Sequence, residues 1–397
     1  MRVLMISDVY FPRINGVSTS IQTFSRELQQ LGHTVDLIAP AYPGQPPDAG
    51  AIERIGSHYL FFDPEDRMMR GSEIRRLLPK LRRCGYDLVH IQTPFVAHYA
   101  GLRLAAELNV PVLESYHTYF EEYLFHYLPW LPRGPLRAAA RSFSRRQCNA
   151  VDAVVVPSGP MQGVLRNYGV TAPLHVIPTG LQMHRFAAGD GGRFRRQFGI
   201  GQERPLLLHA GRLAHEKNID FLLRVLQRVA ASRSDVLLVI AGDGPARAHL
   251  ERLSAQLGLQ GNTLFVGYLE REGALVDGYR AADAFVFASR TETQGLVLLE
   301  AMAAGTPVVS TAHLGTCDIL GPGCGALVAV DDVDDFAGKV IRLLDDADLR
   351  ARLGAEAHDY AQSWSAAALA GKLEQLYLSL LTPDAVPPLA TEPAAVR

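Results

Sequence analysis

Apolar runs of strand length alternate with segments of helical spacing along the chain, and this alternation begins twice. The first set opens at Val3–Ser7, a continuous apolar run of the type that is buried on both faces of a parallel sheet. The second set opens at Pro205–Gly211. Strand–helix alternation is typical of doubly wound α/β domains. The sequence therefore predicts two such domains facing each other across a cleft, where ligands bind beyond the carboxyl ends of the strands.

The same criterion predicts the other strands, and it predicts a first helix over Ser18–Leu31 that Gly32 ends. The further expected strands are Val35–Ala39, Asp87–Gln92, Val110–Ser115, Ala153–Pro157 and His175–Ile177 in the first set, and Val236–Ala241, Thr263–Val266, Ala284–Ala288 and Pro307–Ser310 in the second.

The chain has 397 residues, more than a single hydrophobic core usually supports. We expect a first domain over residues 1–183 and a second over 200–364, connected by the Gly- and Arg-rich segment 186–201. A last helix at about 365–381 is expected to pack back on the first domain. The Ala- and Pro-rich tail 382–397 is expected to be disordered.

Charge and cysteine content exclude several classes of function. The formal net charge is −2, with +3 over residues 1–180 and −5 over the rest, so no nucleic-acid partner is expected. The four cysteines show no Cys-x-x-Cys or Cys/His zinc spacing, so we expect no metal site and free thiols in a reducing cytoplasm. No run approaches the ~20 apolar residues that span a bilayer, and the N-terminus is typical of a strand rather than a secretory signal. Any membrane contact is therefore expected to be peripheral, on the inner face of the cell membrane.

Two motifs follow strands of the second set. The segment Gly211–Asn218 begins with Gly211-Arg212 and contains Lys217, a planar guanidinium and a point charge that suit a diphosphate. A solvated basic loop is the alternative. Gly242-Asp243-Gly244-Pro245 predicts a sharp turn directly after a buried strand, which is more often a plain turn than a binding loop.

The segment from Ser289 to Pro307 is the most informative one. Glu292 lies in a polar loop, and a helix is expected from about Gly295 to Ala304, with free N–H groups at its start that can bind a phosphate. Glu300 falls inside this apolar helix, where a carboxylate needs a partner such as a sugar or ribose hydroxyl, or a core salt bridge. Eight helical residues span about 12 Å, too far for two carboxylates acting on one glycosidic bond. The two glutamates are therefore interpreted as separate contacts on one elongated ligand.

Two features of the first set belong to the same expected cleft. Asn15-Gly16 forms a tight turn between the first strand and the first helix, where Ser18 can cap the helix and the free N–H groups favour an anion. This loop is not a Gly-x-Gly-x-x-Gly, which argues against a dehydrogenase. His117 follows a strand and can share a proton or stabilise developing charge, although a lone histidine is more often structural.

Taken together and in this order, these motifs resemble glycosyltransferase family 4 from Met1 to about Leu381. The resemblance implies the GT-B fold of two Rossmann-like domains, retention of anomeric configuration, a nucleotide-sugar donor, no essential metal and no tightly bound cofactor. It implies that Arg212 and Lys217 hold the donor diphosphate, that Glu292 contacts the sugar and that Glu300 binds the ribose. The remaining residues that it assigns to the donor are Gly16, His117 near the anomeric carbon, Gly242, Thr293, Gln294, Gly295, Leu296 and Val297.

Within the family, the segments Asn15–Val17, His90–Pro94 and Tyr116–Tyr119 are similar to bacterial diacylglycerol glucosyltransferases and to related sulfolipid and mannosyl enzymes. The chain departs from the family at Gln294, where a Phe is frequent, and this puts the choice of sugar in doubt. Glycogen synthases carry Lys-x-Gly-Gly at the first loop, where this chain has Arg13-Ile14-Asn15-Gly16, which argues against that activity.

Two stretches of the first domain suit an anionic bilayer surface. Arg67–Arg83 holds seven basic residues and one acid, and the aromatic stretch Tyr119–Trp130 precedes four arginines spaced four apart, hence on one helical face. The alternative interpretation of these stretches is a solvated helix face that covers the hydrophobic core and contacts no membrane. The residues expected to contact the membrane or the acceptor are Arg75, Arg76, Lys80, Trp130, Arg137, Arg141 and Arg145.

The resulting hypothesis is transfer of a hexose, glucose, from a UDP-sugar to the hydroxyl of diacylglycerol. The alternatives are a mannosyl- or other hexosyltransferase acting on phosphatidylinositol, a polyprenol-linked glycan or a surface polysaccharide. A pyridoxal-dependent phosphorylase and a non-catalytic nucleotide-sugar binder are the alternatives from other classes.

Overall fold

The computed structural model describes residues 1–45, 48, 51–60, 63–119, 121, 133–271 and 273–382. It forms two compact units, the first from Met1–Gly180 together with the segment from Ala366 onward, and the second from Leu181–Ser365. The tail expected to be disordered lies outside the described residues apart from Thr382. No helix in the described part of the chain is both long and apolar enough to span a membrane.

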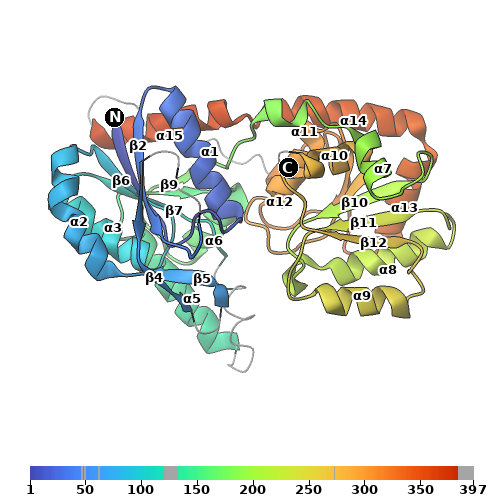
Figure 1. The fold of residues 1–397 in the computed structure, drawn as a ribbon, viewed down its shortest axis with the longest axis horizontal. Helices are drawn as coiled ribbons and strands as arrows, with labels where there is room; N and C mark the ends of the chain where they lie inside the picture. Colours follow the sequence, from blue (N-terminus) through green and yellow to red (C-terminus); the bar gives the residue numbers. More distant parts are fainter. Residues whose placement is uncertain are drawn as a thin grey trace. The chain divides into compact units, whose positions relative to one another are not determined.

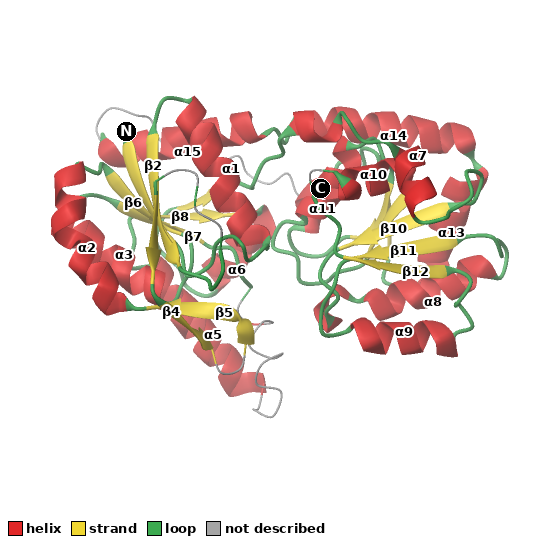
Figure 2. Ribbon diagram, viewed as in Figure 1, coloured by secondary structure: helices red, strands yellow, loops and turns green. Residues whose placement is uncertain are grey.

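The first unit is built on a seven-stranded parallel sheet (Figure 2), in which the strand order is β3-β2-β1-β6-β7-β8-β9. The order reverses between β1 and β6, so the loops that follow these two strands meet at a switch point. The strands are β1 Arg2–Ile6, β2 Thr34–Pro40, β3 Ile52–Ile55, β6 Leu88–Ile91, β7 Val112–Ser115, β8 Ala153–Val156 and β9 Leu174–Val176, with a separate antiparallel pair of β4 Ser57–Leu60 and β5 Asp63–Met69.

Helices cover both faces of this sheet (Figure 1). On one face, α1 Gly16–Gln30 packs beside α15 Ala366–Leu381, so the last helix of the chain completes the core of the first unit. The other face is covered by α2 Gly71–Cys84, α3 Val96–Leu108, α6 Gly159–Asn167 and the end of α5 Arg133–Cys148.

The second unit is built on a six-stranded parallel sheet of order β12-β11-β10-β13-β14-β15, with its switch point between β10 and β13. The strands are β10 Leu206–Ala210, β11 Leu237–Ala241, β12 Thr263–Gly267, β13 Ala284–Phe287, β14 Val308–Thr311 and β15 Ala326–Ala329. One face packs against α7 Gly191–Gln197, α10 Ala274–Ala281, α11 Leu296–Ala303, α12 Thr316–Leu320 and α14 Ala347–Gln362. The other face packs against α8 Ile219–Ala230, α9 Arg247–Gln256 and α13 Val333–Asp345. Two short 3-10 helices complete the unit, η1 Met183–Phe186 and η2 His215–Lys217.

The predicted fold class is confirmed, since each unit is a doubly wound parallel α/β structure. Every strand expected from an apolar run is present within two residues of its expected bounds. The expectation for the connection needs correction, because part of it forms α7, whose Arg193 pairs with Asp277 of α10 through an Nε–Oδ2 contact of 2.5 Å. The cap of α1 is also different from the prediction. Asn15 accepts the hydrogen bond from the Ser18 backbone N–H at 2.9 Å, while the Ser18 hydroxyl donates to the Arg13 carbonyl.

Candidate functional site

In the second unit, the predicted motifs lie on the two loops that flank the switch point. Gly211–Lys217 follows β10, and Ser289–Gly295 follows β13, its neighbour in the sheet. Parallel strands end at the same edge of the sheet, so residues about 75 positions apart in the chain meet there. This is the edge at which ligands of doubly wound sheets bind.

The Gly242–Pro245 turn braces the first of these loops. The Gly211 N–H donates to the Ala241 carbonyl at 3.0 Å, and the Leu213 N–H donates to the Asp243 carbonyl at 2.9 Å. Gly242 has a φ of +135°, and a Cβ at this position would lie 1.9 Å from the Gly211 carbonyl oxygen. The structure thus gives Gly242 a packing role against Gly211. The donor contact expected for Gly242 from the sequence stays a prediction.

Lys217 and Glu292 are brought together by the two loops as an ion pair between Nζ and Oε1, with side chains only 21% and 18% exposed. Asn218, the next residue, has a left-handed backbone conformation, and its side-chain amide donates to the Ala288 carbonyl at 3.2 Å. This bond fastens the Lys217 loop to the end of β13. The structure therefore holds a partly buried cation and a partly buried anion side by side at the sheet edge.

The carboxylate of Glu292 is ionised despite its burial. Burial alone would raise its pKa, but the Lys217 ammonium and the Ser289 hydroxyl outweigh this and hold the pKa of Glu292 below its usual range. A buried carboxylate that stays ionised is an acceptor for sugar hydroxyls, and its bound ammonium is a counter-charge for a phosphate.

Directly beneath this pair lies His209, which was not singled out from sequence. It is fully buried in β10, its Nδ1 lies 3.2 Å from the Val286 carbonyl, and its ring stacks on Phe287. Its Nε2 has no hydrogen-bond partner among the described residues. Burial is the main reason that the pKa of His209 falls to about 4, so the ring is neutral at pH 7.

The start of α11 is shaped by a second close approach of backbones. Gly315 donates its N–H to the Glu292 carbonyl at 2.9 Å, and a Cβ on Gly315 would lie 2.0 Å from the Thr293 carbonyl oxygen. Gly295 precedes the helix, whose first N–H groups have no side-chain cap. Thr293, Leu296 and Val297 are half-buried around it, and Gln294 is buried. Gly315 is thus a supporting residue that no local sequence signal identified.

Glu300 is occupied within the protein. It is 4% exposed, one oxygen pairs with Arg271 and the other accepts from the Tyr279 hydroxyl at 2.9 Å. The salt-bridge alternative considered for this residue is therefore present in the structure. The sequence did not identify Arg271 as the partner of Glu300, because the two residues are far apart along the chain.

Arg212 is exposed at the start of the first loop. The two remaining predicted donor residues, Gly16 and His117, belong to the first unit and follow β1 and β7. Gly16 begins α1 at the switch point of that sheet. The His117 Nε2 lies 3.1 Å from the Gln92 Oε1.

The predicted basic surface is more neutralised than the sequence indicates. Arg137 and Arg141 of α5 both pair with Glu121, at Nε–O distances of 3.0 and 3.1 Å, and that carboxylate is only 5% exposed. In α2, Lys80 pairs with Glu53 at 2.5 Å. Arg75, Arg76 and Arg145 have exposed side chains, and Trp130 lies outside the described residues.

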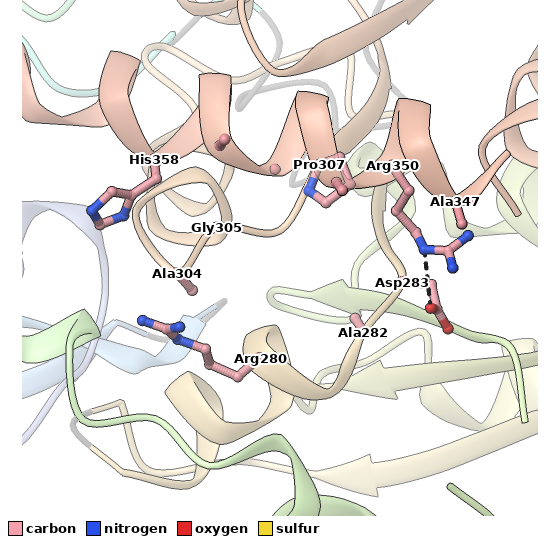
Figure 3. Close-up of a pocket in the computed structure, with 12 residues that line it drawn as sticks. Arg280, Ala282, Asp283, Ala304, Gly305, Pro307, Ala347, Arg350 and His358 are labelled. Carbon is pink, nitrogen blue, oxygen red and sulfur yellow. Dashed lines mark ion pairs between the residues drawn. The ribbon is translucent and has the colours of Figure 1, made fainter. Parts of the chain in front are cut away.

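A cavity of about 630 Å³ in the second unit lies away from these motifs (Figure 3). Its wall includes Asp283 and Pro307, which precede β13 and β14, so it belongs to the amino-terminal edge of the sheet. Two of its side chains hold helix ends: Arg350 donates to carbonyls at the end of α13, and the His358 ring lies 2.8 Å from the Ala303 carbonyl of α11. Arg350 also pairs with Asp283 at 3.5 Å, as the figure shows. We assign these side chains a structural role. Among the described residues, no group of three or more His, Cys, Asp or Glu side chains is placed to hold a metal ion.

The comparison with known proteins agrees with this geometry. The family description "Glycosyltransferase Family 4" matches residues 14–185, and "Glycosyl transferases group 1" matches residues 191–360. The chain is 32% identical over 364 residues to an alpha-monoglucosyldiacylglycerol synthase of Streptococcus pneumoniae, covering 84% of this chain and 80% of that protein. It is 30% identical over 342 residues to a GDP-mannose-dependent alpha-mannosyltransferase of Mycolicibacterium smegmatis, covering 85% and 86% of the two chains.

A solved structure supports the fold. The Anabaena protein HepE, crystallised in complex with UDP-glucose, superposes with a TM-score of 0.76 over 96% of this chain and all of that one, at 17% identity. The predicted GT-B fold is thereby confirmed. With both family descriptions matched in order and relatives at 30% identity or more along most of its length, the chain belongs to glycosyltransferase family 4 and is a hexosyltransferase.

Proposed function

We propose that this chain transfers glucose from UDP-glucose to the hydroxyl of diacylglycerol, with retention of the anomeric configuration. The observation that carries the donor half of this proposal is the partly buried Lys217–Glu292 pair at the switch point between β10 and β13. One member suits a phosphate and the other suits sugar hydroxyls. A nucleotide-sugar contains both groups within one elongated molecule.

The main electrostatic task in this reaction is to neutralise the negative charge that grows on the leaving diphosphate. Lys217, the exposed Arg212 and the N–H groups at the start of α11 would supply the positive charge. Glu292 would bind the sugar hydroxyls, and Thr293 to Val297 would line the sugar and phosphate. The first unit would add Gly16 beside the diphosphate and His117 near the anomeric carbon.

In this proposal the acceptor hydroxyl attacks from the face that the diphosphate leaves, through an oxocarbenium-like state, and a leaving-group phosphate oxygen takes the acceptor proton. Glu292, the carboxylate nearest to the proposed sugar contacts, is held by Lys217. It serves as a binding group rather than as a nucleophile.

Glu300 keeps its proposed contact with the ribose in a modified form. One of its oxygens pairs with Arg271, whose side chain is 29% exposed, and the other accepts from the buried Tyr279 hydroxyl. Ribose hydroxyls would therefore bind the oxygen that pairs with Arg271.

The choice of glucose and diacylglycerol is supported by the name of the Streptococcus relative, and the choice of UDP by the ligand of HepE. A second candidate is transfer of mannose from GDP-mannose, favoured by the Mycolicibacterium relative. Gln294 is buried and replaces a Phe frequent in the family, and it is the residue that, we propose, distinguishes the two sugars.

A panel of labelled UDP- and GDP-sugars, incubated with the protein and with diacylglycerol, phosphatidylinositol or a water-soluble glycan, tests the proposal. Labelled glucosyl-diacylglycerol is expected from UDP-glucose alone. A mannolipid formed from GDP-mannose would establish the second candidate instead, and a product only with the water-soluble glycan would contradict both lipid acceptors.

The acceptor half of the proposal requires contact with a membrane. Helices α2 and α5 lie on one face of the first sheet and carry exposed arginines. Glu121 holds two of them together, at Nε–O distances of 3.0 and 3.1 Å, so they form a fixed pair of half-exposed guanidinium groups rather than two mobile ones. A rigid basic pair loses less side-chain entropy when it binds lipid phosphates.

The variant Arg141→Gln/Arg145→Gln is expected to weaken binding to vesicles with 30 mol% anionic lipid by about 30-fold, from about 1 kcal/mol for each of the two basic residues at the surface. Sedimentation with vesicles at low and high salt measures this. The matched control is Arg228→Gln/Arg252→Gln, two exposed arginines of the second unit. Equal binding by both double variants, or binding that is independent of salt, would contradict the basic surface.

A further inference from the structure

Three buried polar side chains form a hydrogen-bonded chain inside the first unit. The Tyr377 hydroxyl of α15 lies 2.7 Å from the Nδ1 of His90 on β6, and the Nε2 of His90 lies 2.8 Å from the Ser115 Oγ on β7. Tyr377 and His90 are fully buried, and Ser115 is 5% exposed. Burying three polar groups in an otherwise apolar core is costly unless they are paired, which is why such a network calls for an explanation.

Tyr377, His90 and Ser115 form the lower level of an arrangement between β6 and β7, and Gln92 and His117 form its upper level. We call these two levels the ladder. His90 and Gln92 are two residues apart on one side of the β6 end, and Ser115 and His117 are two residues apart on one side of the β7 end. The upper pair is the contact of 3.1 Å between the Gln92 Oε1 and the His117 Nε2. The two levels are linked through the backbones at the ends of β6 and β7, so the position of His90 bears on that of His117, the histidine proposed to lie at the donor sugar.

The direction of the protons follows from counting donors and acceptors. His90 is the partner of the Tyr377 hydroxyl among the described residues, so the tyrosine proton must point at Nδ1 or remain buried without an acceptor. The second arrangement leaves a buried hydroxyl proton unpaired, which is costly. With the tyrosine proton directed at Nδ1, His90 carries its own proton on Nε2 and donates it to Ser115. The Ser115 hydroxyl proton can in turn bind a water molecule, because Ser115 lines a small cavity that Tyr377 does not line.

The same reasoning assigns His117, because Gln92 offers it a carbonyl oxygen. An acceptor at Nε2 fixes the tautomer that carries its proton on Nε2. Burial lowers the pKa of His90 to about 3 and that of His117 to about 4, so both rings are neutral at pH 7. Ser115 and His117 also line a small cavity of about 10 Å³ with Ser20 and Thr179, room for about one water molecule between them.

We propose that Tyr377, His90 and Gln92 are positioning residues that hold His117 as a neutral imidazole of one tautomer and one orientation, and that the last helix of the chain is thereby part of the donor site. His117 then acts through a fixed dipole and its shape, not as an acid or base. This inference rests on the proposed function for the role of His117, whereas the ladder itself is independent of it.

The test is the variant Tyr377→Phe in the full-length protein. It removes the proton that fixes His90 while keeping the ring in the core. We expect kcat for hexose transfer to fall about tenfold, because small displacements of groups at a reacting centre are costly, while the KM for the nucleotide-sugar stays within about twofold. Tyr86→Phe is the matched control, since Tyr86 is also buried and its hydroxyl donates to Asp36 at 2.8 Å. Equal kcat values for the two variants would overturn the proposal.

A second pair of variants separates positioning from simple destabilisation. His90→Gln can place an amide near the position of Nε2 and keep a bond to Ser115, whereas His90→Leu has similar bulk and no polar group. The glutamine variant is expected to keep more of the wild-type kcat than the leucine variant at equal thermal stability. Equal losses in both would contradict a role for the hydrogen bonds.

Nitrogen-15 spectra of the histidine rings test the ladder without any activity. His90 and His117 are expected as the Nε2–H tautomers at pH 7 and to remain neutral down to about pH 5. A proton on Nδ1 of His90 would overturn the assigned direction. If the wild-type protein transfers no hexose, the proposed function fails and this measurement still decides the ladder. If it does transfer hexose but Tyr377→Phe behaves as Tyr86→Phe does, only the present inference fails.

Discussion

Replacing Lys217 by methionine is expected to lower kcat for hexose transfer by about 10²–10³-fold, the usual effect of removing one preorganised group that stabilises developing charge. The loss has two causes. The diphosphate loses a cation, and Glu292 loses the partner that keeps its buried carboxylate ionised and oriented. Steady-state kinetics with the donor and acceptor found by the substrate panel measure the effect.

Lys339→Met is the matched control, because Lys339 pairs with Asp335 on α13 in the same unit and is similarly exposed, at 29%. It is expected to keep kcat within about twofold, since surface pairs contribute about 0–1 kcal/mol. Glu292→Gln should resemble Lys217→Met in kcat while keeping nucleoside diphosphate binding, because its proposed contact is with the sugar and not with the diphosphate. Turnover near that of the wild type in both variants would refute the assignment of this pair to the donor.

Acidification from pH 7 to pH 5 is expected to lower the free energy of unfolding of the second unit by about 2 kcal/mol through one buried histidine, and that of the first unit by more, because it holds two histidines of lowered pKa. The residues are His209 in the second unit and His90 and His117 in the first, and burial lowers their pKa values to about 4, about 3 and about 4 respectively. Above pH 6.5 the ring is neutral in both the folded and the unfolded chain. Below it the unfolded chain takes up a proton that the folded unit cannot accept, so stability falls until the pH reaches the folded pKa.

Urea denaturation at the two pH values, followed by hydrogen exchange resolved along the chain, measures this loss for each unit separately. His209→Gln is expected to remove most of the dependence from the second unit and none from the first. His58→Gln replaces an exposed histidine of the first unit and should leave the dependence unchanged. A second unit that loses the same stability with and without His209 would show that other groups cause the acid sensitivity.

The sequence predicted the elements well where their signal is local. Apolar runs identified β1 and β10, and the loop and helix around Gly295 were expected within one residue of α11. The short strand β3 and the hairpin of β4 and β5 were missed because their residues are only partly apolar. The strand β15 was missed although it is entirely apolar, because a run of four residues is recognised as a strand by its pairing with β14. The start of α1 was predicted, but the choice of Asn15 over Ser18 as its cap depended on backbone geometry.

The site residues show the same contrast between features with a local sequence signal and features that depend on neighbours in space. Lys217 and Glu292 were each expected to contact a ligand from their residue types and their places after strands, and the structure adds that they contact each other. That contact depends on β10 and β13 being neighbours in the sheet, which strand order alone decides. Their assignment to a nucleotide-sugar remains a prediction that the variants above test.

By itself, the sequence determined that this chain forms two parallel α/β units and which loops follow their strands, because the periodicity of apolar residues and the placement of glycines act within a few residues. Only the tertiary structure decided which charges are partnered. Arg271 forms an ion pair with Glu300, Arg137 and Arg141 of α5 form ion pairs with Glu121, and the Tyr377 hydroxyl is hydrogen-bonded to His90. The physical reason is that a buried polar group must find its partner through space, and the partner's distance along the chain leaves no local trace in the pattern of residues.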